Sequence, residues 1–526
     1  MVQAFDENFA VTWADPALAE RTYIYDPMHF PDPMVPFAAE FLQRMYREFM
    51  SSETVYVNGY AFSTPPTPPP PSQAILERGV ADVWAKDLQP PIAAWAREVR
   101  GVDYEPLGLA QFADRIEPVM ESAVRAFGNT MLAITGFMGP TFAMVGFLQE
   151  ALGADGPMLA AAVLQGQENG TAAAGTGLSA LVEAAAARPA VAEALRSGRF
   201  GDIRSVEGGA EFGAQLDAYL DEFGWRAETW CNMERPTWAE EPEAALALLA
   251  RYLDDTAGGP GGAIARAGAQ RDDAIAELRR RLTPEQFTQF EQMLEVTRAH
   301  VPVSEGRALW QLIVIGSLRV PVLALGKKLV AAGALADASD AFYFDSGELR
   351  SLALAPDASA RERAAERRAN LARWQDLTPP PFIGAPLDLE ALPPEMAPLL
   401  TLFFGAAPPV VEEREIRGQG ASRGVVSGRA RVIRELADGN RLEAGEILVC
   451  QTTSPPWTPL FAIAGAVVTD SGGVLSHSAI CAREYGIPCV VATQVATQMI
   501  RDGDLIEVDG SAGVVRFGVS TASATS

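Results

Sequence analysis

Apolar side chains recur at helical spacing through most of the first 376 residues. From residue 106 to residue 374, Ala and Leu dominate and β-branched runs are rare, a pattern that predicts amphipathic helices. The helices expected here are 107–127, 130–152, 158–165, 172–187, 189–197, 209–223, 241–257, 263–281, 284–300, 305–332 and 358–374. Strands and helices do not alternate at the spacing of βαβ units. We therefore predict a large, mostly α-helical domain over residues 1–376 and exclude a TIM barrel or a nucleotide-binding α/β domain from it.

The beginning of this domain is rich in proline. Proline spacing over residues 25–36 forces an extended or turning path, and His29 lies inside that stretch. His29 is interpreted either as a structural histidine packed between prolines and aromatics or as a contact to a ligand. Helices are expected at 37–50 and 73–99, separated by residues 63–72, which contain six prolines and predict a stiff surface segment.

The pattern changes after residue 376. Residues 377–413 are rich in proline and interrupted, which is typical of a linker or hinge. Residues 414–520 then read as a compact α/β domain, and residues 521–526 as a flexible tail. The strands expected in the α/β domain are 424–427, 429–433, 446–450, 464–469, 488–492, 505–509 and 513–517. The predicted fold class is therefore multidomain, with a large helical domain and a small α/β domain.

One of only three histidines, His477, lies at a predicted helix start in the small domain. A strand-like run, 461–468, leads into Gly472 and Gly473, and Ser476 is a candidate N-cap. His477 would then occupy the first helical turn, where unpaired N–H groups and the helix dipole stabilise an anion. This setting favours phosphate chemistry. The alternative is an ordinary helix start with an incidental histidine.

Two patches of the helical domain mix charged and aromatic residues. Residues 223–238 hold three tryptophans, among them Trp230, together with Arg226 and Glu228. The second patch, beginning at Glu305 and Arg307, opens a long apolar helix. Charges amid apolar sequence are costly to bury unless they are paired. The patches therefore predict either inter-helix salt bridges or a pocket for an aromatic substrate and a phosphate.

Charge and composition exclude several function classes. The net charge is −25, of which residues 1–413 carry −24, so neither nucleic acid nor an anionic membrane is an expected partner. No lysine follows a Gly-rich loop at the spacing of an ATP site, and the four cysteines lack the spacing of a metal site. Residues 129–148 are long and apolar enough to span a bilayer, but glycine and proline interrupt them, so a buried helical hairpin is favoured. With no signal peptide evident, we expect a reduced, cytoplasmic protein.

The C-terminal motifs closely resemble the phosphohistidine (swivelling) domain of the phosphoenolpyruvate-utilising enzymes. That family includes phosphoenolpyruvate synthase, pyruvate phosphate dikinase, rifampicin phosphotransferase and phenylphosphate synthase. The resemblance covers about residues 417–517 and is carried by 418–428, 429–433, 445–449, 453–459, 472–484, 486–488, 502–504 and 508–510. It implies a small α/β (β/β/α) fold and a transiently phosphorylated His477. Phosphate-binding roles are expected for Gly472, Gly473, Ser476 and Arg483.

The helical domain resembles the family more weakly, over residues 13–36, 224–240 and 333–349. These stretches are similar to the substrate-binding helical domain of rifampicin phosphotransferase and to the large subunit of phenylphosphate synthase. Substrate-binding residues are expected to be His29, Arg226, Glu228, Trp230, Glu305 and Arg307. Many relatives carry Arg-Glu where this chain has Ser304-Glu305, and Arg307 is the candidate substitute for that arginine.

The resemblance implies a phosphoryl-carrier and acceptor-binding subunit of a phosphotransferase. No ATP-grasp domain is evident before the helical part, and no phosphoenolpyruvate-binding barrel follows the swivel. ATP and Mg²⁺ are therefore expected on a separate ATP-grasp partner, with AMP and phosphate as products, and no cofactor or metal is expected on this chain. The expected acceptor is a hydroxylated, phenolic small molecule, with His29, Glu228 or Glu305 as its base. The alternatives are a component that modifies rifamycin-type antibiotics and a non-catalytic aromatic-ligand-binding relative with a vestigial swivel.

Overall fold

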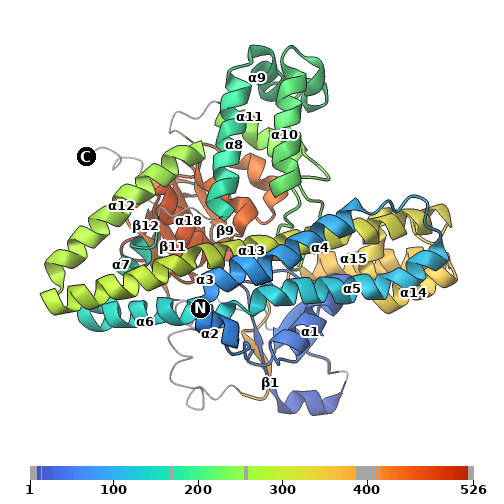
Figure 1. Cartoon of the computed structure of the whole chain (residues 1–526), viewed down its shortest axis with the longest axis horizontal. Coiled ribbons are helices and arrows are strands. Elements are labelled where there is room, and N and C mark those ends of the chain that lie inside the picture. Colours follow the sequence, from blue (N-terminus) through green and yellow to red (C-terminus); the bar gives the residue numbers. More distant parts are fainter. Residues whose placement is uncertain are drawn as a thin grey trace.

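The computed structural model describes residues 9–13, 15–165, 170–253, 259–386, 410–412, 415–474 and 476–518. Within these residues, helices gather around one long central helix, α13 (Pro284–Ala331), and a mixed sheet follows them in the chain. Figure 1 shows the α/β part lying against the helical part rather than apart from it. We call residues 9–386 the helical domain and residues 410–518 the C-terminal domain.

The largest core is a helix bundle. It is built from α1 (Pro36–Phe49), α4 (Gln89–Gly101), α5 (Leu109–Met131), α13, α14 (Ser346–Leu354) and α15 (Ser359–Trp374). Helix α1 shows why these residues bury one face: Phe37, Phe41 and Met45 recur at helical spacing and are fully buried. The helices predicted at 107–127 and 358–374 are confirmed here, whereas α14 was not expected from the sequence.

Helix α13 corrects one prediction. Two helices, 284–300 and 305–332, were expected, but the structure has one helix of 48 residues with Pro302 inside it. A proline inside a helix costs about 3 kcal/mol through a lost hydrogen bond and a steric clash. Helix α13 packs against α5 and α4 along one half and against α6 (Ile134–Leu152) along the other, and this packing outweighs the local cost.

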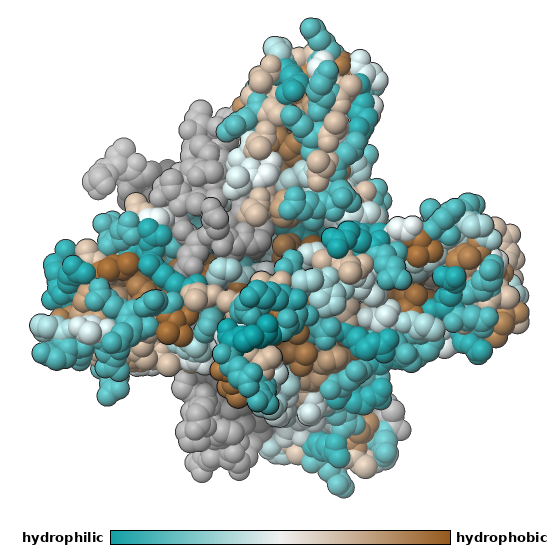
Figure 2. Space-filling view, viewed as in Figure 1, coloured by the Kyte–Doolittle hydropathy of each residue, from teal (hydrophilic) through white to brown (hydrophobic). Residues whose placement is uncertain are grey.

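By length and composition, α13 could also cross a membrane, and it is the one such helix among the described residues. However, 72% of its most apolar window is buried inside the protein, as expected for a core helix. The face in Figure 2 is mostly hydrophilic, and its hydrophobic residues are scattered rather than gathered in one band. The apolar run 129–148 spans the end of α5 and most of α6.

A second correction concerns a small antiparallel sheet in the helical domain. Its strand order is β2 (Thr54–Val57), β3 (Tyr60–Ser63), β1 (Thr22–Tyr25) and β4 (Phe382–Gly384). Residues Asn58 and Gly59 join β2 to β3 with φ angles of 49° and 75°. An Asn-Gly pair between apolar runs is a strong hairpin signal, so the sequence carried information that the helical interpretation missed.

Helices α8 to α11 form an arm that contacts the C-terminal domain, at the top of Figure 1. Their bounds are α8 (Gly170–Ala186), α9 (Pro189–Arg196), α10 (Gly209–Phe223) and α11 (Glu243–Tyr252). Leu216 of α10 and Leu249 of α11 share one apolar cluster with Leu448 and Phe461 of the C-terminal domain. On the other side, α7 (Gly156–Ala162) and α12 (Gly259–Arg281) pack with α6. Short helices α2 (Gln73–Arg78) and α3 (Val80–Val83) complete the domain.

The C-terminal domain is built on a mixed sheet with the order β5-β6-β13-β12-β8-β9-β10-β11-β7. The bounds are β5 (Val410–Glu412), β6 (Glu415–Arg417), β7 (Gln419–Ser422), β8 (Val425–Val432), β9 (Ile447–Cys450), β10 (Ala466–Thr469), β11 (Cys489–Val491), β12 (Leu505–Asp509) and β13 (Val514–Phe517). Strands β8 to β11 pair in parallel, and all residues of β9 and β10 are buried, which explains their continuous apolar runs.

The strand-like run 461–468 is only partly a strand. Thr458–Phe461 form a short helix, α17, and β10 begins at Ala466. The predicted linker also contributes structure: β4 pairs with β1, and β5 pairs with β6. The rest of the predicted linker, 387–409, and the predicted tail, 521–526, lie outside the described residues.

Candidate functional site

His477 is the first residue of α18 (His477–Tyr485), as the sequence predicts. The Ser476 side chain caps the helix by accepting a hydrogen bond from the amide of Ala479 at 3.4 Å. Gly486 ends the helix in the left-handed conformation. Before the helix, Gly472 has a φ of +97°, and a Cβ atom there would lie 2.8 Å from Ser476 Oγ. Glycine at 472 therefore allows the positive φ angle of the loop and leaves space for the Ser476 side chain.

Three neighbours hold the His477 ring. Nε2 lies 3.2 Å from Thr458 Oγ1 and 3.3 Å from Cys481 Sγ, and the ring also hydrogen-bonds the backbone of Ser454. In the neutral ring, one of the two nitrogens carries the proton. The other nitrogen then keeps its lone pair. This is the form of imidazole that acts as a nucleophile.

The electrostatics of the site also favour the neutral ring. Burial, and after it the positive charge of Arg226, lower the pKa of His477 to about 3. A buried cation is disfavoured, and a nearby cation disfavours it further. At neutral pH, His477 is therefore uncharged, and an anion bound to it would meet Arg226.

Arg226 comes from the helical domain. Its Nε donates to the carbonyl of Phe223 at 2.8 Å, and its guanidinium lies 5.8 Å from the Phe223 ring and 5.9 Å from the Trp238 ring. Burial lowers the pKa of Arg226, but an arginine begins so high that it stays charged. The predicted residue Arg226 thus provides a fixed cation beside the histidine of the other domain.

Arg483, also on α18, contacts the sheet of the C-terminal domain. Its Nη1 donates to the carbonyl of Ala421 on β7 at 2.8 Å, and burial lowers the pKa of the guanidinium to about 10. This contact ties α18 to the sheet. A phosphate-binding role for Arg483 stays a prediction, as do the roles predicted for Gly472, Gly473 and Ser476.

The predicted residues His29 and Trp230 form one stack. Their ring centroids are 4.5 Å apart with an interplanar angle of 22°, and His29 Nδ1 lies 2.6 Å from Asp26 Oδ2. The edge of Phe127 meets Trp230 at 5.2 Å and 84°. The segment that carries His29 touches the C-terminal domain, because Ser471 Oγ donates to the carbonyl of Pro27. An aromatic patch therefore lies on the helical side of the domain boundary.

Glu228, Glu305 and Arg307 occupy different surroundings. The Glu228 carboxylate bonds Arg235 and the amide of Leu436 at the domain boundary. Burial, and Glu305 next, raise the pKa of Glu484 to about 8. Burial lowers the pKa of Arg307 to about 10, and the negative charge of the nearby Glu305 partly offsets this effect.

Glu484 is a residue that the sequence reading did not single out. It follows His477 by seven positions, two helical turns, and so lies on the same face of α18. This seven-residue spacing was the signal in the sequence that placed Glu484 on the same helix face as His477.

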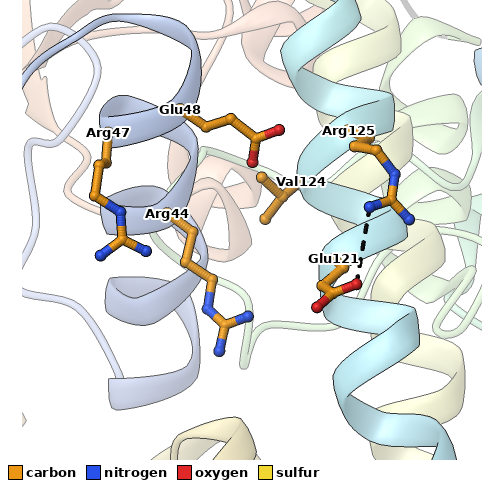
Figure 3. Close-up of a pocket in the computed structure, with 6 residues that line it drawn as sticks. All are labelled: Arg44, Arg47, Glu48, Glu121, Val124 and Arg125. Atoms are coloured by element: carbon orange, nitrogen blue, oxygen red, sulfur yellow. Dashed lines mark ion pairs between the residues drawn. The ribbon is translucent and has the colours of Figure 1, made fainter.

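A cavity of about 330 Å³ lies apart from these residues, between α1 and α5. Figure 3 shows its mixed lining of Arg44, Arg47, Glu48, Glu121, Val124 and Arg125, with an ion pair of 3.8 Å between Glu121 and Arg125. None of the predicted site residues lines it. Among the described residues, no group of three or more His, Cys, Asp or Glu side chains is placed to hold a metal ion.

Comparison with known protein families matches two parts of the chain. Residues 442–513 match the "PEP-utilising enzyme, mobile domain", and residues 129–305 match the "Rifampicin phosphotransferase fourth domain". Both matched regions are therefore similar to the PEP-utilising enzymes. The mobile-domain match contains His477 with its loop. The second match contains Arg226, Glu228, Trp230 and Glu305, whereas His29 and Arg307 lie outside both.

Individual relatives cover different shares of the chain. It is 32% identical over 557 residues to chondramide synthase cmdD of Chondromyces crocatus, an alignment that covers 97% of this chain and 14% of that protein. It is 31% identical over 329 residues to a rifampicin phosphotransferase of Streptomyces sviceus (60% of this chain, 36% of that protein). Phosphoenolpyruvate synthase of Aeropyrum pernix is 48% identical over 104 residues (20% and 13%). The chain therefore spans well under two thirds of the length of these relatives.

Proposed function

We propose that this protein is the phosphoryl-carrier and acceptor-binding component of an ATP-dependent phosphotransferase. His477 receives the phosphoryl group, and the helical domain holds the hydroxyl compound to which the group passes. The observation that carries the proposal is the burial of His477, on the C-terminal domain, near enough to Arg226 of the helical domain for the charge of the arginine to lower the histidine pKa. It brings a neutral imidazole and a buried cation together at the start of a helix.

The proposed chemistry has two steps. First, ATP and water give AMP, phosphate and phospho-His477: the β-phosphoryl group bonds to the ring nitrogen and the γ-phosphoryl group goes to water. Second, the nitrogen–phosphorus bond breaks as the acceptor oxygen bonds to phosphorus, and the hydroxyl proton passes to a base. Arg226 and the N–H groups at the start of α18 stabilise the charge on the transferred group. Dividing the reaction this way replaces one difficult transfer by two easier ones.

The proposed acceptor is a phenol. The stacked rings of His29 and Trp230, with Phe127 against them, supply flat apolar surface beside the domain boundary. A phenol loses its proton at a pKa of about 10, so a base helps at neutral pH. His29 is the best placed of the predicted bases, because Asp26 orients its ring. The Glu228 carboxylate already accepts hydrogen bonds from Arg235 and Leu436, which makes it a poorer candidate.

We further propose that a separate ATP-grasp protein binds the ATP and Mg²⁺. One observation supports this: the sequence carries no Gly-rich loop with a following lysine.

A rifamycin-type acceptor is the second candidate. It is favoured by one observation, the match of residues 129–305 to the rifampicin phosphotransferase fourth domain. The two candidates differ in acceptor size while sharing the carrier chemistry. Both candidates involve phosphoryl transfer, which distinguishes them from the alternative of a relative that binds an aromatic ligand without transferring phosphate.

The test is a turnover assay with an ATP-grasp protein encoded beside this chain. We expect AMP and phosphate to form in step with a phosphorylated phenol when phenol or a substituted phenol is supplied. Formation of ADP, or turnover that survives His477→Ala, would contradict the proposal. Turnover with rifampicin and not with phenols would favour the second candidate, and ligand binding without any phosphoryl transfer would favour the non-catalytic alternative.

A further inference from the structure

The segment 226–235 of the helical domain hydrogen-bonds the C-terminal domain at several points. Glu228 makes two of them: its Oε1 accepts a hydrogen bond from the amide of Leu436 at 2.9 Å, and its carbonyl accepts one from Ser454 Oγ at 2.5 Å. The Glu228 side chain is only 11% exposed. A carboxylate buried in this way needs partners, and half of its partners belong to the other domain.

Arg235 completes the contact. Its Nη1 donates to Glu228 Oε2 at 3.2 Å and its Nη2 donates to Glu435 Oε1 at 3.1 Å. Asp32, on the helical side, lies 3.9 Å from the same guanidinium. Arg235 is 16% exposed, and Glu435, on the C-terminal domain, is 46% exposed. The guanidinium therefore joins Glu228 and Asp32 of the helical domain to Glu435 of the C-terminal domain.

This cluster is connected to His477 through Ser454. The Ser454 hydroxyl donates to the Glu228 carbonyl, while the Ser454 backbone hydrogen-bonds the His477 ring. Arg226 lies two residues before Glu228 on the same segment. A shift of the C-terminal domain at this point would therefore move His477 away from Arg226.

We propose that Glu228 and Arg235 are positioning residues that dock the mobile domain in its acceptor-facing place. Their recognition partners are the Leu436 amide, the Glu435 carboxylate and the Ser454 hydroxyl. Glu228 then acts through Ser454 and Arg226 instead of serving as a base for the acceptor. The inference rests on the proposed carrier function and assigns these residues to its second step.

The first test measures docking without any catalysis. Diethyl pyrocarbonate modifies neutral histidine rings, and peptide mapping distinguishes His477 from His29 and His300, the other two histidines. In the full chain we expect Arg235→Gln and Glu435→Gln to raise the modification rate of His477 about tenfold, the effect of losing a charge-assisted hydrogen bond. Amide exchange of the peptide containing Leu436 should rise in parallel.

The matched control is Glu507→Gln. Glu507 pairs with Arg516 at 2.7 Å inside the C-terminal domain, so its loss removes an ion pair of the same kind without touching the boundary. We expect His477 to be modified at the wild-type rate. Unchanged His477 modification and Leu436 exchange in both boundary variants would overturn the docking proposal.

The second test separates the two half-reactions. The boundary variants should still accept label at His477 from β-labelled ATP and the ATP-grasp partner, but should pass it to the acceptor about tenfold more slowly. Equal slowing of both steps would indicate a general structural role. If His477 is never labelled in the wild type, the proposed function fails, while the modification and exchange data still decide the docking proposal.

Discussion

His477 of the mobile domain and Arg226 of the helical domain lie close enough that the arginine lowers the histidine pKa. The same relationship that disfavours imidazolium favours a phosphoryl group on the ring, because that group carries negative charge. In the proposed function, this arrangement corresponds to the carrier histidine at the acceptor side of its path.

Replacement of Arg226 should slow transfer from His477 to the acceptor. We expect Arg226→Gln to reduce the single-turnover transfer rate about 100-fold, the usual effect of removing one preorganised charge-stabilising donor. Loading of His477 should change much less, since Arg226 is proposed to act in the second step. Arg100→Gln is the control, because Arg100 stacks on Trp225 at 5.1 Å and is not among the groups that shift the His477 pKa. Equal transfer rates in both variants would contradict this role.

Glu484 should make stability depend on pH. Burial, and next Glu305, raise the pKa of Glu484 to about 8 from 4.5, so the folded state holds its proton more tightly than the unfolded chain does. This contribution to the free energy of unfolding is fully present below pH 4.5 and is lost as the pH rises through 8. Burial raises the pKa of Glu234 to about 7, so Glu484 dominates between pH 7 and 8. Urea unfolding should show a fall there that Glu484→Gln abolishes; a fall of the same size in the variant would refute the assignment.

His477 should act in the opposite direction. Its folded-state pKa of about 3 lies below the ordinary 6.5, so the stability it contributes is present above pH 6.5 and is lost as the pH falls toward 3. In His477→Asn, the urea unfolding free energy should therefore decline less between pH 6.5 and pH 4.5. An unchanged pH profile would show that the ring is not buried as a neutral group.

Gly472 should tolerate no side chain. Its φ of +97° strains any other residue, and a Cβ atom would also lie 2.8 Å from the capping hydroxyl of Ser476. We expect Gly472→Ala to lower the free energy of unfolding by about 1–3 kcal/mol and to impair phosphorylation of His477. Gly445→Ala is the matched control, because Gly445 has a φ of +81° but no atom within 4 Å of the added Cβ. Gly445→Ala should lower the free energy of unfolding, but His477 should still be phosphorylated.

The sequence predicted the site in the C-terminal domain better than the site in the helical domain. Ser476, His477 and Gly486 act through local rules of helix capping, so their places follow from a few neighbouring residues. The role of Glu228 depends on Leu436 and Ser454, more than 200 positions away, and no local pattern reports such a contact. Helix α13 shows the same limit, since tertiary packing carries it through Pro302. The Asn58-Gly59 hairpin was a local signal, overlooked beneath the helical periodicity around it.

Mapping the phosphorylated residue decides whether His477 is the phosphoryl carrier. The full chain is incubated with the proposed ATP-grasp partner and ATP labelled in the β-phosphate, and each histidine is replaced in turn. We expect acid-labile label on His477, lost in His477→Ala and kept in His29→Ala and His300→Ala. Stable label in His477→Ala, or label that follows either of the other two histidines, would contradict this expectation.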